Sequence, residues 1–189
     1  MRLDKARLEP QEADAWSDEV KAIMQPFVKE GADYNIFKTL THHPDLMRRW
    51  MVFANHVLFK STLPLREREL VILRIGYLCD AGYEWGQHAQ VARKAGMSDE
   101  EILSTKSGPD TPGISERDKL LMQATDELHA DTHIGDETWA ALERHFDKKQ
   151  LMDLVFTVGQ YNLVSMVLNT LGVQPDDGLP DWDLKPQHR

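Results

Sequence analysis

Cysteine is almost absent from this chain, which has only Cys79 among its 189 residues. A single thiol cannot form an intramolecular disulfide, and it cannot complete a redox cycle that needs an attacking and a resolving thiol. Cys79 stands in an apolar stretch, where a thiol usually packs as a small hydrophobic side chain. We therefore expect an inert core cysteine and no dithiol chemistry within one chain.

A basic excess and several sequence signals are also lacking. The net charge of −9 opposes nucleic-acid binding, because a phosphate backbone needs a clustered basic face. The opening residues, MRLDKARLEPQEAD, contain no apolar signal segment, and the chain has no nucleotide-binding glycine pattern. No strand-like alternation of useful length occurs. We therefore expect an all-α, cytoplasmic protein with no nucleic-acid partner.

Apolar residues recur at helical spacing through most of the chain. We expect an arm with one helix over 1–33 and an extended tail over 174–189, with a helical domain between them. Pro26 is expected to stop or kink the first helix. Outside the central stretch, the longer helices are predicted over 11–25, 44–59, 115–130, 136–146 and 150–171.

Helix-start signals mark the beginnings of three helices. Ser98 and Glu101 form a capping-box pattern, and Ser115 precedes another helical run. One of the adjacent histidines His42 and His43 is expected to cap the helix that follows them.

The apolar run over 150–171 is long enough to raise the question of a membrane span. Polar side chains interrupt it at Asp153, Gln160, Asn162 and Asn169. We therefore predict a core or interface helix and no membrane partner. Buried polar groups need partners, which makes Gln160, Tyr161 and Asn162 candidates for a subunit seam or a pocket wall.

The stretch from Glu69 to Gly96, ELVILRIGYLCDAGYEWGQHAQVARKAG, predicts an apolar helix, a short break and a second helix. Glu84 and His88 are four residues apart on the apolar face of the second helix, so they are neighbours. Gly76 has no Cβ and would let the second helix come close. If the two helices fold against each other, Glu69 joins this pair. Buried carboxylates and an imidazole titrate as a coupled group, which suits general acid–base catalysis.

These residues also allow a purely structural interpretation. Glu84 lies near a helix start, where the helix dipole favours a carboxylate, and His88 could be a hydrogen-bonded core histidine. His129 and His133 are four residues apart, but the surrounding stretch is polar and lacks a metal-ligand signature. We predict no metal and no cofactor.

The central segment resembles the carboxymuconolactone decarboxylase and AhpD-like alkylhydroperoxidase superfamily. The AhpD pattern is a glutamate, eleven residues, Cys-x-x-Cys, three residues and a histidine. Glu69 and His88 occupy the outer positions of this spacing, whereas Ala81 and Glu84 stand at the cysteine positions.

The motif Tyr83-Glu84-Trp85-x-x-His88 is similar to a cysteine-free branch of the superfamily. The segments NIFKTLTHHPDLMRRW and LMDLVFTVGQYNLVSMVLNTLGV extend the likeness over residues 34–173.

The resemblance implies an AhpD-like helical bundle and a lyase similar to carboxymuconolactone decarboxylase, acting on a small carboxylated or lactone substrate. It assigns His88 as proton donor and acceptor, Glu84 as the group that orients it, and Glu69 as a second acid or relay. The residues expected to contact the substrate are Tyr83, Trp85 and Tyr161.

Other functions stay open on the same scaffold. Isomerisation or hydrolysis of a lactone would use the same residues. An AhpD-like peroxidase is disfavoured, because its nucleophile is a thiolate and both motif cysteines are missing. A non-catalytic binding protein could keep the pocket. The resemblance also implies a homo-oligomer, either a trimer or a hexamer, and leaves the substrate unnamed.

Overall fold

The structure is a computed structural model that describes residues 2–180 and 184. Within these residues it consists of helices and loops and contains no strand, so the all-α prediction is confirmed for the described part. A 3-10 turn, η1 (Ala13–Ala15), precedes the α-helices. These are α1 (Asp18–Glu30), α2 (Asn35–Leu40), α3 (Pro44–Phe59), α4 (Leu65–Leu78), α5 (Gly82–Lys94), α6 (Asp99–Ser107), α7 (Glu116–Asp131), α8 (Asp136–Leu142) and α9 (Lys148–Leu171).

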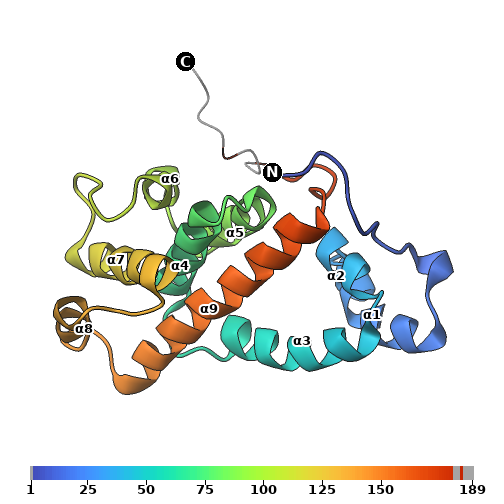
Figure 1. Ribbon diagram of the computed structural model, residues 1–189, viewed down its shortest axis with the longest axis horizontal. Helices are drawn as coiled ribbons and strands as arrows, with labels where there is room; N and C mark the ends of the chain where they lie inside the picture. Colours follow the sequence, from blue (N-terminus) through green and yellow to red (C-terminus); the bar gives the residue numbers. More distant parts are fainter. Residues whose placement is uncertain (1, 181–183, 185–189) are drawn as a thin grey trace, which may run out of the picture.

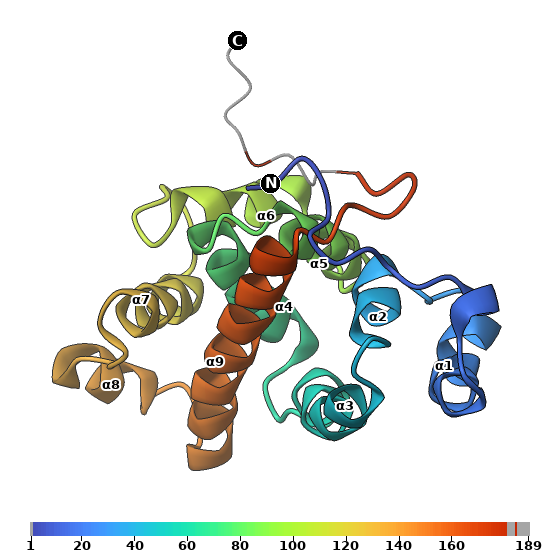
Figure 2. The same cartoon turned by 45° about the vertical axis from the view of Figure 1, so that its right-hand side comes forward.

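The long helix α9 runs through the middle of the molecule (Figure 1). On one side, α4 packs against α9 and also against α5, α6 and α7. On the other side, α3 packs against α9, and α1 and α2 pack against α3 (Figure 2). Helix α9 therefore joins two groups of helices, and the site described below lies where these groups meet.

Helix α4 is buried because its sequence is apolar nearly all round. Every residue from Arg68 to Gly76 is buried, and the apolar residues from Leu70 to Leu73 and Ile75 belong to the main hydrophobic cluster. A charged side chain in such a helix needs an ion-pair or hydrogen-bond partner, because an unpaired buried charge is strongly destabilising. Arg74, for example, donates two hydrogen bonds to Asp126 at 2.6 and 2.8 Å.

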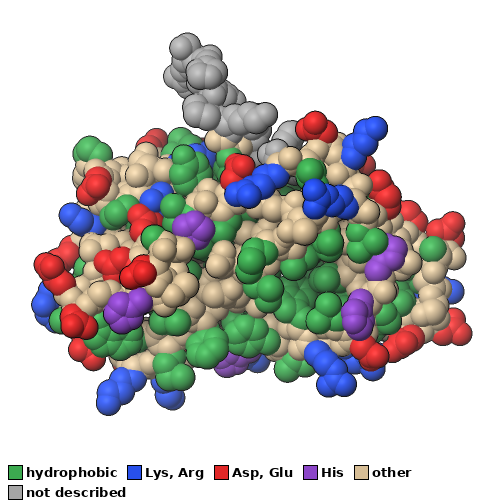
Figure 3. Space-filling model, viewed as in Figure 1, with side chains coloured by type: hydrophobic (Ala, Val, Ile, Leu, Met, Phe, Trp, Pro, Cys, Tyr) green, Lys and Arg blue, Asp and Glu red, His purple; other side chains and the backbone are tan. Residues whose placement is uncertain are grey.

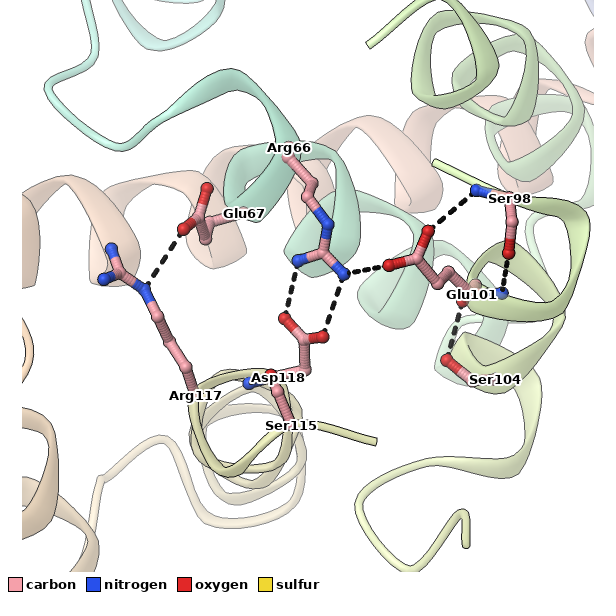
Figure 4. Close-up of polar contacts among 8 residues, drawn as sticks. All are labelled: Arg66, Glu67, Ser98, Glu101, Ser104, Ser115, Arg117 and Asp118. Carbon is pink, nitrogen blue, oxygen red and sulfur yellow. Dashed lines mark hydrogen bonds and ion pairs between the residues drawn. The ribbon is translucent and has the colours of Figure 1, made fainter. Parts of the chain in front are cut away.

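The first turn of α4 is fixed by ion pairs to two other helices. Figure 4 shows Arg66 between Asp118 of α7 and Glu101 of α6. Its guanidinium nitrogens lie 2.7 and 2.9 Å from the Asp118 carboxylate and 2.5 Å from Glu101. The next residue, Glu67, forms an ion pair with Arg117 at 3.1 Å. These bonds hold α4 in register with α6 and α7.

The predicted helix caps are confirmed. Ser98 and Glu101 form the complete capping box at the start of α6. Ser115 and His43 each accept a hydrogen bond from the backbone nitrogen three residues later, at the starts of α7 and α3. His43 is thus the capping member of the His42–His43 pair.

The first helix differs from the prediction of 11–25. Helix α1 begins after Ser17, whose hydroxyl caps it, and continues through Pro26 to Glu30. Pro26 is exposed, so water can solvate the carbonyl that loses its helical partner, and the helix need not stop there. The helix ends instead at Gly31, which adopts the left-handed conformation with φ of 63°.

Helix α9 is long and apolar enough to cross a membrane by length and composition alone. Half of its most apolar window is buried inside the molecule, and the core helix of a compact domain meets the same criteria. Its position agrees with the predicted core or interface helix, and the expected lack of a membrane partner stays a prediction.

The predicted tail over 174–189 is described only in part, since residues 181–183 and 185–189 lie outside the described residues. The described part is anchored by Asp176. Its carboxylate accepts hydrogen bonds from the Asn35 backbone nitrogen at 2.7 Å, from the Tyr83 hydroxyl at 2.5 Å and from Gln87 at 2.8 Å. The start of the tail therefore ties α2 to α5.

Candidate functional site

A cavity of about 1010 Å³ lies between α9, α5, α3 and the α1–α2 pair. Figure 3 shows apolar side chains gathered in a hollow over this region, in the right half of the view. Most lining side chains are aliphatic or aromatic. We call the part of the cavity around His88 the closed end, and each residue of the closed end is less than one-tenth exposed. The closed end consists of Arg68, Glu84, His88, Gln160 and Tyr161.

His88 lies between two carboxylates. Its Nδ1 is 2.6 Å from Oε2 of Glu69, and its Nε2 is 3.1 Å from Oε1 of Glu84. Both ring nitrogens can donate at once only when the imidazole is protonated. The geometry therefore favours an imidazolium ion bonded to a carboxylate on each side.

The electrostatics agree with this protonation state. Burial by itself lowers the pKa of His88, because it disfavours the charged form. The attraction and hydrogen bonds of Glu69 and then Glu84 outweigh burial, and the pKa rises to about 10. His88 therefore carries its proton at neutral pH.

Glu69 is fully buried and has a second cationic partner. Nε and Nη2 of Arg68 lie 3.3 and 3.2 Å from its Oε1, while His88 engages the other carboxylate oxygen. A buried carboxylate without such partners would be strongly destabilising. Arg68 and His88 thus balance the charges of Glu69 and Glu84.

Tyr161 completes the closed end. Its ring meets the His88 ring edge to face, with centroids 4.9 Å apart and planes at 84°. Burial, together with the charges of Glu84 and Glu69, raises the pKa of Tyr161 well above its ordinary value. The phenol therefore keeps its proton and can donate a hydrogen bond.

The connection between α4 and α5 is what brings the acidic residues together. Asp80 turns the chain with a positive φ of 52°, a conformation that aspartate tolerates better than most residues. Helix α5 then folds back along α4. A Cβ built on Gly76 would lie 3.6 Å from the Trp85 nitrogen and 3.8 Å from Cγ of Glu84, which is ordinary van der Waals contact. The predicted convergence of Glu69, Glu84 and His88 is therefore observed.

Of the three residues predicted to contact the substrate, two line the cavity and one does not. Tyr83 and Tyr161 line the cavity, but the Tyr83 hydroxyl is already bonded to Asp176. Trp85 does not line it. Neighbouring residues on a helix point about 100° apart, and Trp85 faces α6, where its indole nitrogen donates to the Thr105 hydroxyl at 3.3 Å. The expected contact between Trp85 and the substrate therefore has no support from this position and stays a prediction.

The two carboxylates also differ in position. Glu84 lines the cavity. Glu69 contacts the far side of the His88 ring and does not line the cavity. These positions favour Glu69 as the group that orients the ring and Glu84 as the one that shares its proton on the substrate side. The resemblance implies the opposite roles, and both assignments stay predictions.

Arg68 is the site residue that the sequence analysis missed. It lines the cavity and bonds to Glu69. A signal was present, because a glutamate in an apolar helix needs a cation and Arg68 is its immediate neighbour.

Cys79 is buried and is not a cavity-lining residue. Its thiol donates to Oδ1 of Asn162 at 3.1 Å, and burial raises its pKa. The expectation of an unreactive core cysteine agrees with both findings. Among the described residues, no group of three or more His, Cys, Asp or Glu side chains is arranged to hold a metal ion.

Comparison with known proteins gives a partial match to one family and a fold. The model of the carboxymuconolactone decarboxylase family matches residues 44–107. No curated protein matches the chain significantly in sequence.

Several solved structures are similar over nearly the whole chain. One is described as an AhpD-core, uncharacterized peroxidase-related protein from Ralstonia eutropha JMP134, with 21% identity, a TM-score of 0.79, and 91% of this chain and 93% of that chain covered. An uncharacterized peroxidase-related protein from Silicibacter sp. TM1040 has 13% identity, a TM-score of 0.81, and 96% and 97% covered. A variant of the debrominase Bmp8, in complex with 2,3,4-tribromopyrrole, has 11% identity, a TM-score of 0.74, and 92% and 94% covered. The fold is therefore AhpD-like.

Proposed function

Residues 44–107 match the model of the carboxymuconolactone decarboxylase family, and from this match and the geometry of the site we propose that the chain is a lyase. It removes carbon dioxide from a carboxylated or lactone substrate by acid–base catalysis at the closed end. The observation that carries the proposal is His88, held 2.6 Å from Glu69 and 3.1 Å from Glu84 beside a large cavity.

The reaction needs a proton at the carbon that loses its carboxylate. When that carbon–carbon bond breaks, its electron pair moves toward an adjacent carbonyl and forms an enolate. The guanidinium of Arg68 and the phenol of Tyr161 are placed to stabilise the developing negative charge. The proton between Nε2 of His88 and Oε1 of Glu84 then passes to the carbon.

Solvent restores the proton to the imidazole after each turnover. The substrate carboxylate and one proton thus give carbon dioxide and the product with a new carbon–hydrogen bond. Glu69 lies behind the ring and holds it in place, as a positioning residue.

Two other functions of the scaffold have weaker support. A thiol peroxidase would need a reactive cysteine, whereas Cys79 is buried, has a raised pKa and does not line the cavity. A non-catalytic binding protein would have the same cavity. A buried imidazolium between two carboxylates favours the enzyme, because perturbed titratable groups concentrate at catalytic sites.

The test is turnover of carboxymuconolactone, and of a panel of β-keto acids, in deuterated water. The wild type should release carbon dioxide and place one deuterium on the carbon that lost it. His88→Gln should lower kcat by roughly 10²–10⁴-fold, the range for loss of a general acid or base.

His56→Gln is the matched control, since His56 is exposed on α3 and does not line the cavity. It should keep wild-type activity. Full turnover by His88→Gln would contradict the proposed role of His88. A wild type that binds these acids and turns over none would support the binding protein.

A further inference from the structure

The cavity is much larger than the substrate that gives the family its name. Pockets that enclose drug-sized ligands typically measure about 300–1,000 Å³, and this cavity has about 1010 Å³. A compact lactone at the closed end would leave most of the remaining volume unfilled.

The unfilled part is apolar, and the chain outside the family segment builds much of it. Helices α1 and α2 contribute Ile23, Phe27, Ile36 and Phe37, all of which precede the matched residues 44–107. Helix α3 adds Trp50, Met51, Ala54 and Leu58 along the same wall. Surfaces of this kind stabilise a ligand by removing its hydrocarbon from water.

The closed end, in contrast, offers a polar group that has no partner. Gln160 is only 4% exposed and lines the cavity, and its Oε1 has no hydrogen-bond partner among the described residues. A buried acceptor without a donor is unfavourable, so a ligand donor at this place would be stabilising. Arg68 lies at the same end and supplies a cation.

A ligand with one polar end and a long apolar body would match this distribution of polar and apolar side chains. The inference rests on the proposed function for the reaction that the ligand undergoes. We propose that the natural substrate is an amphiphilic carboxylic acid. Its carboxylate lies at Arg68, a hydroxyl next to the carboxylate donates a hydrogen bond to Oε1 of Gln160, and its apolar body of about ten or more carbons extends along α3 beneath α1 and α2.

Binding of dodecanoate, measured by calorimetry on the full chain, tests this substrate class without requiring turnover. Dodecanoate should bind with one molecule per chain. Hexanoate, six methylenes shorter, should bind at least a hundredfold more weakly, because each buried methylene contributes about fourfold. Dodecanol, which lacks the anionic head, should bind at least about tenfold more weakly than dodecanoate.

Two variants separate the head from the body. Arg68→Leu should weaken dodecanoate at least about tenfold and leave dodecanol nearly unchanged. Ala54→Trp fills the apolar wall without touching the Arg68–Glu69 ion pair, and should abolish dodecanoate binding. Val52→Trp makes the same change on the same helix, at a residue that is 75% exposed and outside the cavity lining, and should bind normally. Circular dichroism confirms that each variant is folded.

No dodecanoate binding at 1 mM, or equal binding by Ala54→Trp and Val52→Trp, would overturn the proposal. Equal affinities for dodecanoate and dodecanol would contradict the proposal that the polar end of the ligand is anionic. The lyase proposal fails with a different result: dodecanoate would bind, but the protein would turn over none of the acids. Turnover of carboxymuconolactone without dodecanoate binding would keep the lyase and remove the amphiphilic substrate.

Discussion

The imidazole of His88 gives the protein a predictable dependence of stability on pH. Its pKa in the folded chain is about 10, and an unfolded histidine titrates near its ordinary value of 6.5. Because the folded pKa is the higher one, the stabilising contribution is fully present below pH 6.5 and is lost as pH rises toward 10. Within this window, one such group changes the free energy of unfolding by at most about 1.4 kcal/mol per pH unit.

Urea unfolding at pH 6, 8 and 10 measures this contribution when wild type is compared with His88→Gln. The stability difference between the two should shrink as pH rises. His56→Gln should follow the wild type at every pH. A difference that stays constant from pH 6 to pH 10 would mean that His88 is not held as a cation.

Cys79 supports a second prediction, of no thiol-dependent peroxidase turnover. Its thiolate fraction is small because burial raises its pKa, and no second cysteine exists in the chain to resolve an oxidised thiol. Peroxide consumption with an added thiol reductant should be near background in both the wild type and Cys79→Ser. Peroxidase activity in the wild type that Cys79→Ser abolishes would contradict this prediction and support the peroxidase function.

How far the sequence predicts the site depends on the kind of neighbour involved. Glu84 and His88 could be paired because their spacing of four is a local property of one helix. The side that Trp85 faces, and the cavity contacts of Arg68, depend on which helices pack around α4 and α5. Helical periodicity predicts that each residue is buried or lies beside the buried face of its helix. It contains no information about which other helix packs against that residue.

At the scale of elements, the loop between α6 and α7 depends on a glycine. Gly108 has φ of 89°, and a Cβ there would lie 2.6 Å from Nη2 of the buried Arg74. Gly113 in the same loop has φ of 81° and nothing within 4 Å of an added Cβ. The pair therefore separates backbone strain from a steric clash.

Gly113→Ala should lower the free energy of unfolding by ~1–2 kcal/mol, the cost of a left-handed residue with a side chain. Gly108→Ala should cost roughly 3 kcal/mol or more, because the displaced Arg74 also loses hydrogen bonds. Chemical denaturation of both variants gives the comparison. Equal losses would show that Arg74 moves aside without cost.

The helices themselves were predictable where local signals mark them. The caps at Ser98 and Ser115 are short-range hydrogen bonds whose donors and acceptors lie within four residues. The start of α1 was missed, although Ser17 is an ordinary capping residue. Its continuation through Pro26 depends on exposure, which is a property of the folded molecule.

At the scale of the whole molecule, α9 leaves a set of apolar side chains exposed. They recur at helical spacing and include Met152, Val155, Phe156, Leu163 and Met166, of which Met152 is 60% exposed. Phe53 of α3 lies beside them, its ring centroid 5.9 Å from that of Phe156. Contiguous exposed apolar surface of this kind is typical of a protein interface.

We propose that this face joins copies of the chain into the trimer or hexamer that the family resemblance implies. Light scattering at micromolar protein should give a mass several times 21.7 kDa. Phe156→Glu should shift the mass toward one chain, whereas Trp139→Glu, a partly exposed aromatic on α8, should not. A stable monomer of the wild type would contradict the oligomer.

The protonation state of His88 is the most direct test of the account, because the proposed acid requires a proton at neutral pH. Nitrogen-15 NMR of the labelled imidazole rings reports this state for each histidine, and His88→Gln assigns the relevant signal. The account predicts that His88 stays an imidazolium through pH 8 and titrates near pH 10. A neutral ring at pH 8, titrating near 6.5, would contradict the shared proton between His88 and its two carboxylates.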